Sequence, residues 1–234
     1  MNIKKEIIDY CKKNRVSTTE VADALGKQGV FEGSQAFNYG RYEVGSVRCI
    51  FTANGSNYDV HDQIRSVKEG EIVVIFTENC EDKAILGALV AKYLLLYMGA
   101  SAIVVQGKIR DAAQLRRENY SIWCEGVTPL GCHNQPEKGY EESRKKLLLD
   151  QFEGAIAVCD EGGVAIIPSG SINIDTLNNL KLIEMQEDVW EFCLDSLKWD
   201  TKKIVCDKDY LTDSDTLPKK HIENLAELKK KLDN

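Results

Sequence analysis

The segment from Ala84 to Gly131 constrains the fold of this 234-residue chain more than any other part. Its first section has apolar side chains at three- and four-residue spacings and stops at Gly99, as a helix does: Leu86, Leu89, Val90, Tyr93, Leu94, Tyr97 and Met98. Residues 101–106 follow with an unbroken β-branched run, which is typical of a strand covered on both faces. A helix joined directly to a buried strand predicts an α/β protein.

A guanidinium and a carboxylate lie side by side directly after this strand, as Arg110 and Asp111 in a predicted turn over 107–111. Ligands of α/β proteins collect at the carboxyl ends of such strands. The start of the preceding helix, Gly87 to Val90, offers free N–H groups and the positive end of the helix dipole, which together favour an anion. These two elements predict a binding site for a small anion.

The rest of the chain alternates short apolar strands with amphipathic helices. Strands are predicted at 47–52, 72–76, 101–106, 121–124 and 164–167, and helices at 2–13, after the S-x-x-E capping box that starts at Ser17, at 173–199 and at 219–231. Asp23, inside the helix that starts at this capping box, is interpreted as a surface or capping carboxylate. His61, with no second histidine nearby, is interpreted as a solvated or core histidine. The pattern predicts one α/β domain followed by a helical extension.

Composition excludes several classes of protein. The net charge is −7 and the basic runs are short and scattered, so no concentrated basic surface for nucleic acid is expected. Eight cysteines without a C-x-x-C motif are typical of a reducing compartment. We expect no membrane span, because the longest apolar run is too short, and no signal peptide, so the chain is expected in the cytoplasm.

Four motifs in order carry a resemblance to a known family. They are VSTTEVADALG (16–26), GKIRD (107–111), GVTP (126–129) and CDEGGVAIIP (159–168). Together, over residues 15–170, they resemble the RraA-like family, which includes the regulator of ribonuclease activity A and the 4-hydroxy-4-methyl-2-oxoglutarate aldolases. The resemblance implies a swivelling β/β/α core with outer helices around two packed sheets, an αββα-type sandwich. It also implies a homotrimer or a dimer of trimers with the site at a subunit boundary.

Two domains follow from this reading: an RraA-like domain at 1–170, and a helical extension at 171–234 packed on that domain or on a neighbouring subunit. The extension carries Trp190, Phe192 and Trp199, aromatic residues expected to be exposed on one chain and buried against another. This expectation adds to the case for an oligomer.

The chemistry predicted at the site is that of a lyase acting on a 2-oxo acid. Arg110 would bind the substrate carboxylate in bidentate geometry, and the backbone at Gly87, Ala88, Leu89 and Val90 would take its other side. Asp111 would hold Mg²⁺, or another divalent cation such as Mn²⁺, against the keto oxygen. Retro-aldol cleavage and oxaloacetate decarboxylation both pass through a metal-stabilised pyruvate enolate, and the resemblance implies both activities. Arg110 and Asp111 are thus the predicted catalytic residues.

The sequence departs from the aldolase pattern at two acidic positions, which are Leu89 and Gln114 here. The acidic loop at 78–82 could replace them with Glu78, Glu81 or Asp82. Two other functions stay open: a non-catalytic binding protein of the ribonuclease-regulator type, and a sugar-acid enzyme on the same scaffold. The Arg110–Asp111 pair could also have a purely structural role and only stabilise a turn.

Overall fold

The computed structural model describes residues 2–212 and 215–232. The chain divides into two compact units, residues 1–174 and 175–234, and each is described here by itself. The predicted domain division after residue 170 and the predicted packing of the extension remain predictions. No helix within the described residues is long and apolar enough to cross a membrane.

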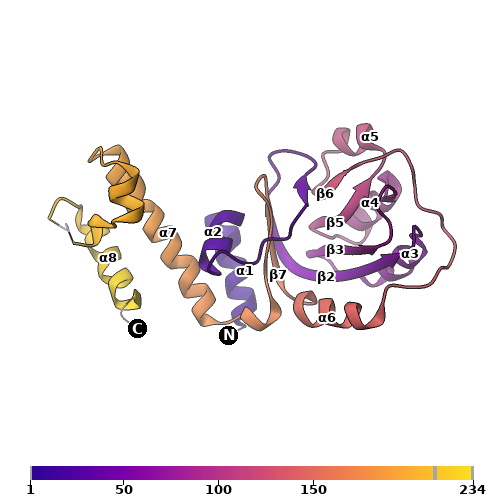
Figure 1. Cartoon of the computed structure of the whole chain (residues 1–234), viewed down its shortest axis with the longest axis horizontal. Helices are drawn as coiled ribbons and strands as arrows, with labels where there is room; N and C mark the ends of the chain where they lie inside the picture. Colours follow the sequence, from indigo (N-terminus) through magenta and orange to yellow (C-terminus); the bar gives the residue numbers. More distant parts are fainter. Residues whose placement is uncertain (1, 213–214, 233–234) are drawn as a thin grey trace. The chain divides into compact units, whose positions relative to one another are not determined.

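The first unit is built on a mixed eight-stranded sheet (Figure 1). Its strands are β1 (Gln35–Ala36), β2 (Glu43–Ala53), β3 (Glu71–Glu78), β4 (Ala84–Leu86), β5 (Ala102–Ile109), β6 (Ile122–Val127), β7 (Ile156–Asp160) and β8 (Gly163–Ile167). The strand order is β1-β6-β5-β3-β2-β7-β8, with β4 paired to the end of β5. Pairing is parallel from β2 through β3 and β5 to β6, and antiparallel at β1, β7 and β8.

The two ends of the sheet approach each other. The segment just before β1 runs along β8, where the Phe31 N–H donates to the Val164 carbonyl at 2.9 Å and Val30 bridges to Ala165. The same segment then forms β1, which pairs with β6 at the opposite end of the strand order. The α/β fold is therefore confirmed as a nearly closed, curved sheet with flanking helices, and the two layers expected to pack belong to this one sheet.

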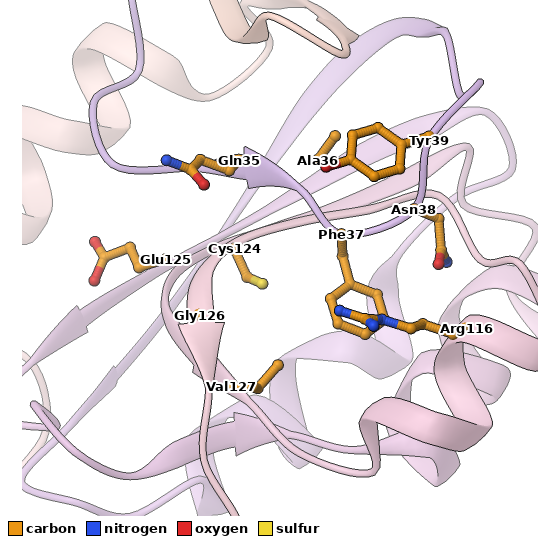
Figure 2. A pocket seen from close by; sticks show the side chains of 10 residues that line it. All are labelled: Gln35, Ala36, Phe37, Asn38, Tyr39, Arg116, Cys124, Glu125, Gly126 and Val127. Carbon is orange, nitrogen blue, oxygen red and sulfur yellow. The ribbon is translucent and has the colours of Figure 1, made fainter.

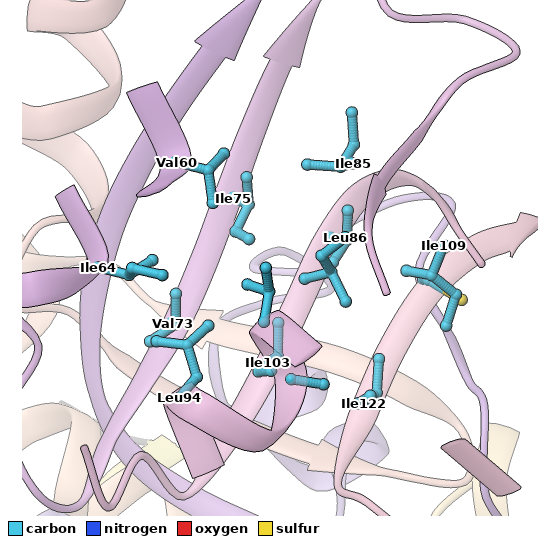
Figure 3. Close-up of a cluster of buried hydrophobic side chains, with 14 of the residues drawn as sticks. Val60, Ile64, Val73, Ile75, Ile85, Leu86, Leu94, Ile103, Ile109 and Ile122 are labelled. Carbon is cyan, nitrogen blue, oxygen red and sulfur yellow. The ribbon is translucent and has the colours of Figure 1, made fainter. Parts of the chain in front are cut away.

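Alternation along the strands separates two apolar cores. In β3, Ile72, Val74 and Phe76 face one core, while Val73 and Ile75 face the other, as a side-chain period of two requires. The first core fills the inside of the curve. The second lies under α3 and α4 and is drawn in Figure 3. Both cores contain β5 residues, so the strand that leads to Arg110 is anchored on both faces.

Helices flank the sheet, and most of them lie where the sequence predicts a helix. The first unit contains α1 (Ile3–Asn14), α2 (Thr18–Ala24), α3 (Tyr58–Gln63), α4 (Ala88–Lys92), α5 (Ala112–Arg117) and α6 (Glu142–Phe152), with 3₁₀ turns at Ile64–Ser66 and Ser169–Ser171. The capping box is confirmed, because the Ser17 N–H donates to Glu20 at 2.6 Å and the Glu20 N–H donates to the Ser17 hydroxyl at 3.1 Å.

Two predictions in the organising segment were wrong. Residues 107–109 do not form a turn, because they continue β5, where Lys108 pairs with both Ala84 and Gly126. The apolar helix face is also broken: Leu89 is 80% exposed and Tyr97 is 74% exposed. For Tyr97 the reason is a π-helical turn over Tyr93–Tyr97, which takes one extra residue per turn and rotates the side chains at its end away from the core, whereas Leu89 lies in α4, before this turn.

The second unit is helical. It contains most of α7 (Ile174–Asp195), a π turn (Lys202–Cys206), a 3₁₀ turn (Asp209–Leu211) and α8 (Lys219–Leu232). The expectation that its aromatic residues are exposed was wrong, because Trp190, Phe192 and Trp199 pack against a small core that contains Val189 and Tyr210. These side chains therefore give no separate reason for an oligomer, and the trimer remains a prediction.

Candidate functional site

The Asp111 carboxylate connects the end of β5 to the start of α4. Its Oδ2 accepts a hydrogen bond from the Ala88 N–H at 2.9 Å. The Arg110 N–H donates to the Leu86 carbonyl at 3.0 Å, which aligns the chain after β5 with β4. Asp111 has φ +61°, in the left-handed region that Asp and Asn enter more readily than other non-glycine residues. Both side chains are exposed to solvent.

Two glycines leave room for this pair. A Cβ at Gly87 would lie 2.3 Å from Asp111 Oδ2 and 3.0 Å from Arg110 Cγ, and a Cβ at Gly131 would lie 2.5 Å from Arg110 Nη1. Gly87 has φ −134°, which any residue can adopt. The requirement at Gly87 is therefore space for the two charged side chains and not backbone freedom.

A pocket of about 130 Å³ opens beside the pair. It brings together residues from β4, from α3 and its N-cap, from α4 and its N-cap, and from the segments after β5 and β6: Asn57, His61, Ala84, Leu86, Gly87, Leu89, Val90, Arg110, Asp111, Cys132 and Asn134. Of the residues predicted at the site, Gly87, Leu89, Val90, Arg110 and Asp111 line this pocket. A guanidinium, a carboxylate, an imidazole and two carboxamides thus converge on one small volume.

Ala88 takes part in a different way from the one expected. Its N–H was predicted to bind a substrate carboxylate, but it binds the carboxylate of Asp111. The physical reason is that Asp111 brings its own negative charge to the positive end of the helix. The Ala88 N–H is therefore not free for a further anion, and Arg110 is the arginine that lines this pocket.

Asn57 is a pocket residue that sequence reasoning missed. Its Nδ2 donates to the Ile85 carbonyl at 3.2 Å, which fixes the orientation of the amide. Its Oδ1 is buried and has no hydrogen-bond partner among the residues described. An asparagine just after the Asn54-Gly55 turn indicates only a turn in the sequence, so no signal singled it out. His61, interpreted as solvated, is indeed exposed but lies at this pocket.

The acidic loop does not supply the acidic residues that this chain lacks. Glu78 pairs with Arg144 at 3.5 Å and accepts the Glu141 N–H at 3.1 Å. Asp82 pairs with Lys108 at 2.6 Å, and this hydrogen bond lowers the pKa of the Asp82 carboxyl. Neither these two side chains nor Glu81 lines the pocket. Among residues 2–212 and 215–232, no three His, Cys, Asp or Glu side chains cluster as a preformed metal site.

A larger cleft of about 580 Å³ lies along β1 and β6 (Figure 2). Its one cation, Arg116, is placed over the ring of Phe37 at 5.1 Å, and Glu125 points away from that ring in Figure 2. Charged groups do not converge here as they do around Asp111. The smaller pocket is therefore the better candidate for chemistry, despite its size.

Known proteins give the context for this pocket. The chain is 26% identical over 179 residues to a protein of Halalkalibacterium halodurans named "Putative 4-hydroxy-4-methyl-2-oxoglutarate aldolase", covering 70% of this chain and 78% of that protein. Among solved structures, an uncharacterized protein from Pseudomonas syringae has TM-score 0.64 at 20% identity, with 82% of this chain and 93% of that one covered.

Streptomyces coelicolor RraAS2, titled an unusual member of the RNase ES inhibitor RraA protein family, has TM-score 0.61 at 20% identity, with coverages of 79% and 95%. At such identities the solved structures establish the fold alone. The RraA-like family profile, described as Aldolase/RraA, matches residues 18–166, a span that contains every residue lining the Arg110–Asp111 pocket. The chain therefore belongs to the RraA-like family.

Proposed function

We propose that this protein is a divalent-metal-dependent carbon–carbon lyase acting on small 2-oxo acids, by retro-aldol cleavage or by decarboxylation of the oxaloacetate type. The observation that carries the proposal is the convergence of Arg110 and Asp111 on one pocket of about 130 Å³. That volume suits a substrate of a few carbon atoms. The aldolase name of the Halalkalibacterium relative supports the same reaction class.

Arg110 binds the substrate carboxylate. Its guanidinium lies between the backbone at Gly87 and Gly131, and both glycines lack the side-chain atom that would displace it. A planar fork held in this way can donate two parallel hydrogen bonds to a carboxylate. The carboxylate end of the substrate is thereby fixed, and the bond to be broken is directed towards Asp111.

The donor set at Asp111 fits a hard divalent cation. The second oxygen of the carboxylate, Oδ1, has no hydrogen bond among the described residues, and Asn57, whose buried Oδ1 has no hydrogen-bond partner there, is another residue of the same pocket. Mg²⁺ is commonly held by one or two protein oxygens and several waters. Asp111 and Asn57 would hold it, and the ion would act as a Lewis acid towards the negative charge that develops on the keto oxygen.

His61 provides the proton chemistry in this proposal. Its imidazole lies at the pocket and is open to solvent, so it can exchange protons with bulk water. Breaking the carbon–carbon bond leaves a carbanion-like carbon that must take up a proton, and an imidazole can donate one. Asn134 also lines the pocket and offers a carboxamide to substrate hydroxyl groups.

The direct test is to incubate the full chain with oxaloacetate and Mg²⁺ and to follow pyruvate, with 4-hydroxy-4-methyl-2-oxoglutarate as a second substrate. Because Mg²⁺ alone promotes decarboxylation, the reference is the same mixture with heat-denatured protein. We expect pyruvate formation above this reference, and we expect a chelator to abolish it. No acceleration with either substrate, in Mg²⁺ or in Mn²⁺, would overturn the proposal in favour of a non-catalytic protein.

A further inference from the structure

An apolar groove adjoins the Arg110–Asp111 pocket. Its volume is about 390 Å³, roughly three times the 130 Å³ of the pocket. The residues that line it are His61, Ile64, Arg65, Leu89, Val90 and Tyr93. Because His61, Leu89 and Val90 also line the pocket, a ligand held by Arg110 can extend past these side chains into the groove.

Two helical segments form the walls of the apolar groove. On one side, His61 in α3 and both Ile64 and Arg65 in the following 3₁₀ turn share a face, at spacings of three and four residues. On the other side, Leu89 in α4 lies one turn before Tyr93. Ile64 is buried in the core of Figure 3, and Tyr93 packs against that core. Both walls are therefore anchored to the folded unit.

The lining of the groove suits an apolar group better than a charged one. Among the described residues that line it, Arg65 carries the permanent charge, and its guanidinium pairs with Asp62 and donates to the Asp62 carbonyl at 3.2 Å. A second carboxylate on a ligand would thus find no unpaired arginine or lysine in this lining. Leu89 is 80% exposed, so a ligand group that covers it removes apolar surface from water.

We propose that the substrate of this site is a 4-hydroxy-2-oxo acid whose fourth carbon carries an apolar alkyl or aromatic group, and that this group binds in the apolar groove. The assignment rests on the proposed function, because it takes Arg110 to bind the carboxylate at the other end of the substrate.

The reaction balances without an oxidant or a reductant. The bond between the third and fourth carbons breaks, and its electron pair stays on the third carbon as the enolate of pyruvate. The hydroxyl group loses its proton, and its oxygen becomes that of an aldehyde. The third carbon takes up one proton, so the products are pyruvate and an apolar aldehyde. His61 lines both volumes and can carry this proton.

The binding step can be tested without turnover. 2-Oxo-4-phenylbutanoate lacks the hydroxyl group and cannot undergo retro-aldol cleavage, and 2-oxobutanoate and 2-oxoglutarate carry hydrogen and a carboxylate in place of its phenyl ring. Calorimetry on the full chain with Mg²⁺ should show that the phenyl compound binds about tenfold tighter than either of the others. Equal affinities for the three compounds would overturn the proposal.

Leu89→Lys tests the groove directly. The new ammonium group should weaken binding of 2-oxo-4-phenylbutanoate about tenfold and strengthen that of 2-oxoglutarate. Leu96→Lys is the matched control, because Leu96 is also exposed, lies in the π turn after α4 and lines neither volume. This control should bind all three compounds like the native chain. An unchanged order of affinities in folded Leu89→Lys protein would overturn the proposal.

Light scattering distinguishes a different occupant of the groove. If Leu89→Lys dissociates an assembly of the native chain and leaves the order of affinities unchanged, a second copy of the chain covers the groove, and the proposal is overturned. If the mass of the particle is unchanged while the preference for the phenyl compound is lost, the groove binds the substrate.

Turnover separates this proposal from the proposed function. 4-Hydroxy-2-oxo-4-phenylbutanoate should give pyruvate and benzaldehyde with a kcat/KM about tenfold above that of 4-hydroxy-2-oxopentanoate or 4-hydroxy-2-oxoglutarate. Cleavage of all three at equal kcat/KM would support the lyase and overturn the apolar substrate. Tight binding of 2-oxo-4-phenylbutanoate without cleavage of any substrate would support the role of the groove and contradict the lyase. Absence of both binding and cleavage would overturn both proposals.

Discussion

Two aspartates at the ends of strands differ in the number of hydrogen bonds that their carboxylates accept. Asp160 ends β7, and its carboxylate accepts hydrogen bonds from the Thr18 N–H at 2.8 Å, the Thr18 hydroxyl at 2.7 Å and the Gly162 N–H at 2.8 Å. Asp111 follows β5 and accepts the Ala88 N–H at 2.9 Å. A glycine lies next to each carboxylate. A Cβ at Gly162 would crowd Asp160, and a Cβ at Gly87 would crowd Asp111.

The comparison teaches how a structural carboxylate differs from one that is free to bind. Both oxygens of Asp160 are occupied, and the bonds tie the β7–β8 hairpin to the start of α2. Asp111 is positioned through one oxygen, and the residue lines a pocket together with Arg110. A carboxylate with few protein donors keeps its lone pairs for a ligand. We therefore expect substitutions at Asp160 to affect stability and those at Asp111 to affect chemistry.

The largest effect should come from Asp111→Asn. The amide can keep the Ala88 contact and the left-handed backbone but loses the charge that holds a cation, so the metal-dependent rate should fall roughly 10²–10³-fold. The free energy of unfolding should change by less than about 0.5 kcal/mol, as for surface substitutions. Steady-state rates against Mg²⁺ concentration, with urea unfolding in parallel, measure both. An unchanged Mg²⁺ dependence would contradict the metal assignment.

Asp160→Ala should have the opposite profile. Removing a carboxylate that accepts three hydrogen bonds leaves partly buried donors unpaired, and we expect a loss of about 3 kcal/mol in unfolding free energy. Urea denaturation should show a lower midpoint with an unchanged slope. The rate of the folded protein should stay close to that of the native chain. A large loss of rate in fully folded protein would contradict the structural role of Asp160.

Gly87→Ala tests the space around Asp111. Since the new methyl group would lie 2.3 Å from Asp111 Oδ2, the carboxylate must move, and we expect kcat/KM to fall about 30-fold. Gly126→Ala is the matched control, because a Cβ there meets nothing within 4 Å. Equal kinetics for the two variants would show that the position of Asp111 does not matter.

Arg110→Lys keeps the charge but loses the planar fork. We expect KM for oxaloacetate to rise about 10-fold, with a smaller change in kcat. Initial rates over a range of substrate concentrations separate the two. A fall in kcat at unchanged KM would place Arg110 in transition-state stabilisation instead of ground-state binding.

Asn57→Asp should give the smallest effect, and in the favourable direction. A second negative charge near Asp111 should tighten Mg²⁺ binding about threefold, as measured by calorimetry without substrate. Asn57→Ala is the companion variant and should weaken binding. If both variants bind Mg²⁺ like the native chain, Asn57 is no ligand.

The sequence was informative where local chemistry decides the structure. The capping box at Ser17, the buried strands and the Arg110–Asp111 pair at a sheet edge all depend on neighbouring residues, and the structure contains each of them. It was less informative where long-range pairing decides. The continuation of β5 to Ile109 requires β4 as a partner, and the pocket position of Asn57 depends on a contact with Ile85. Neither contact produces a periodic pattern of apolar residues in the sequence.

The curvature of the sheet bears on how this protein behaves at high concentration. Open strand edges expose unpaired N–H and C=O groups, which recruit further strands and begin aggregation. Here β8 is covered on its outer side by the segment at Val30 and Phe31, and β1 at the other end has only two residues, Gln35–Ala36. The first unit should therefore resist edge-to-edge association even though its strands are rich in β-branched residues.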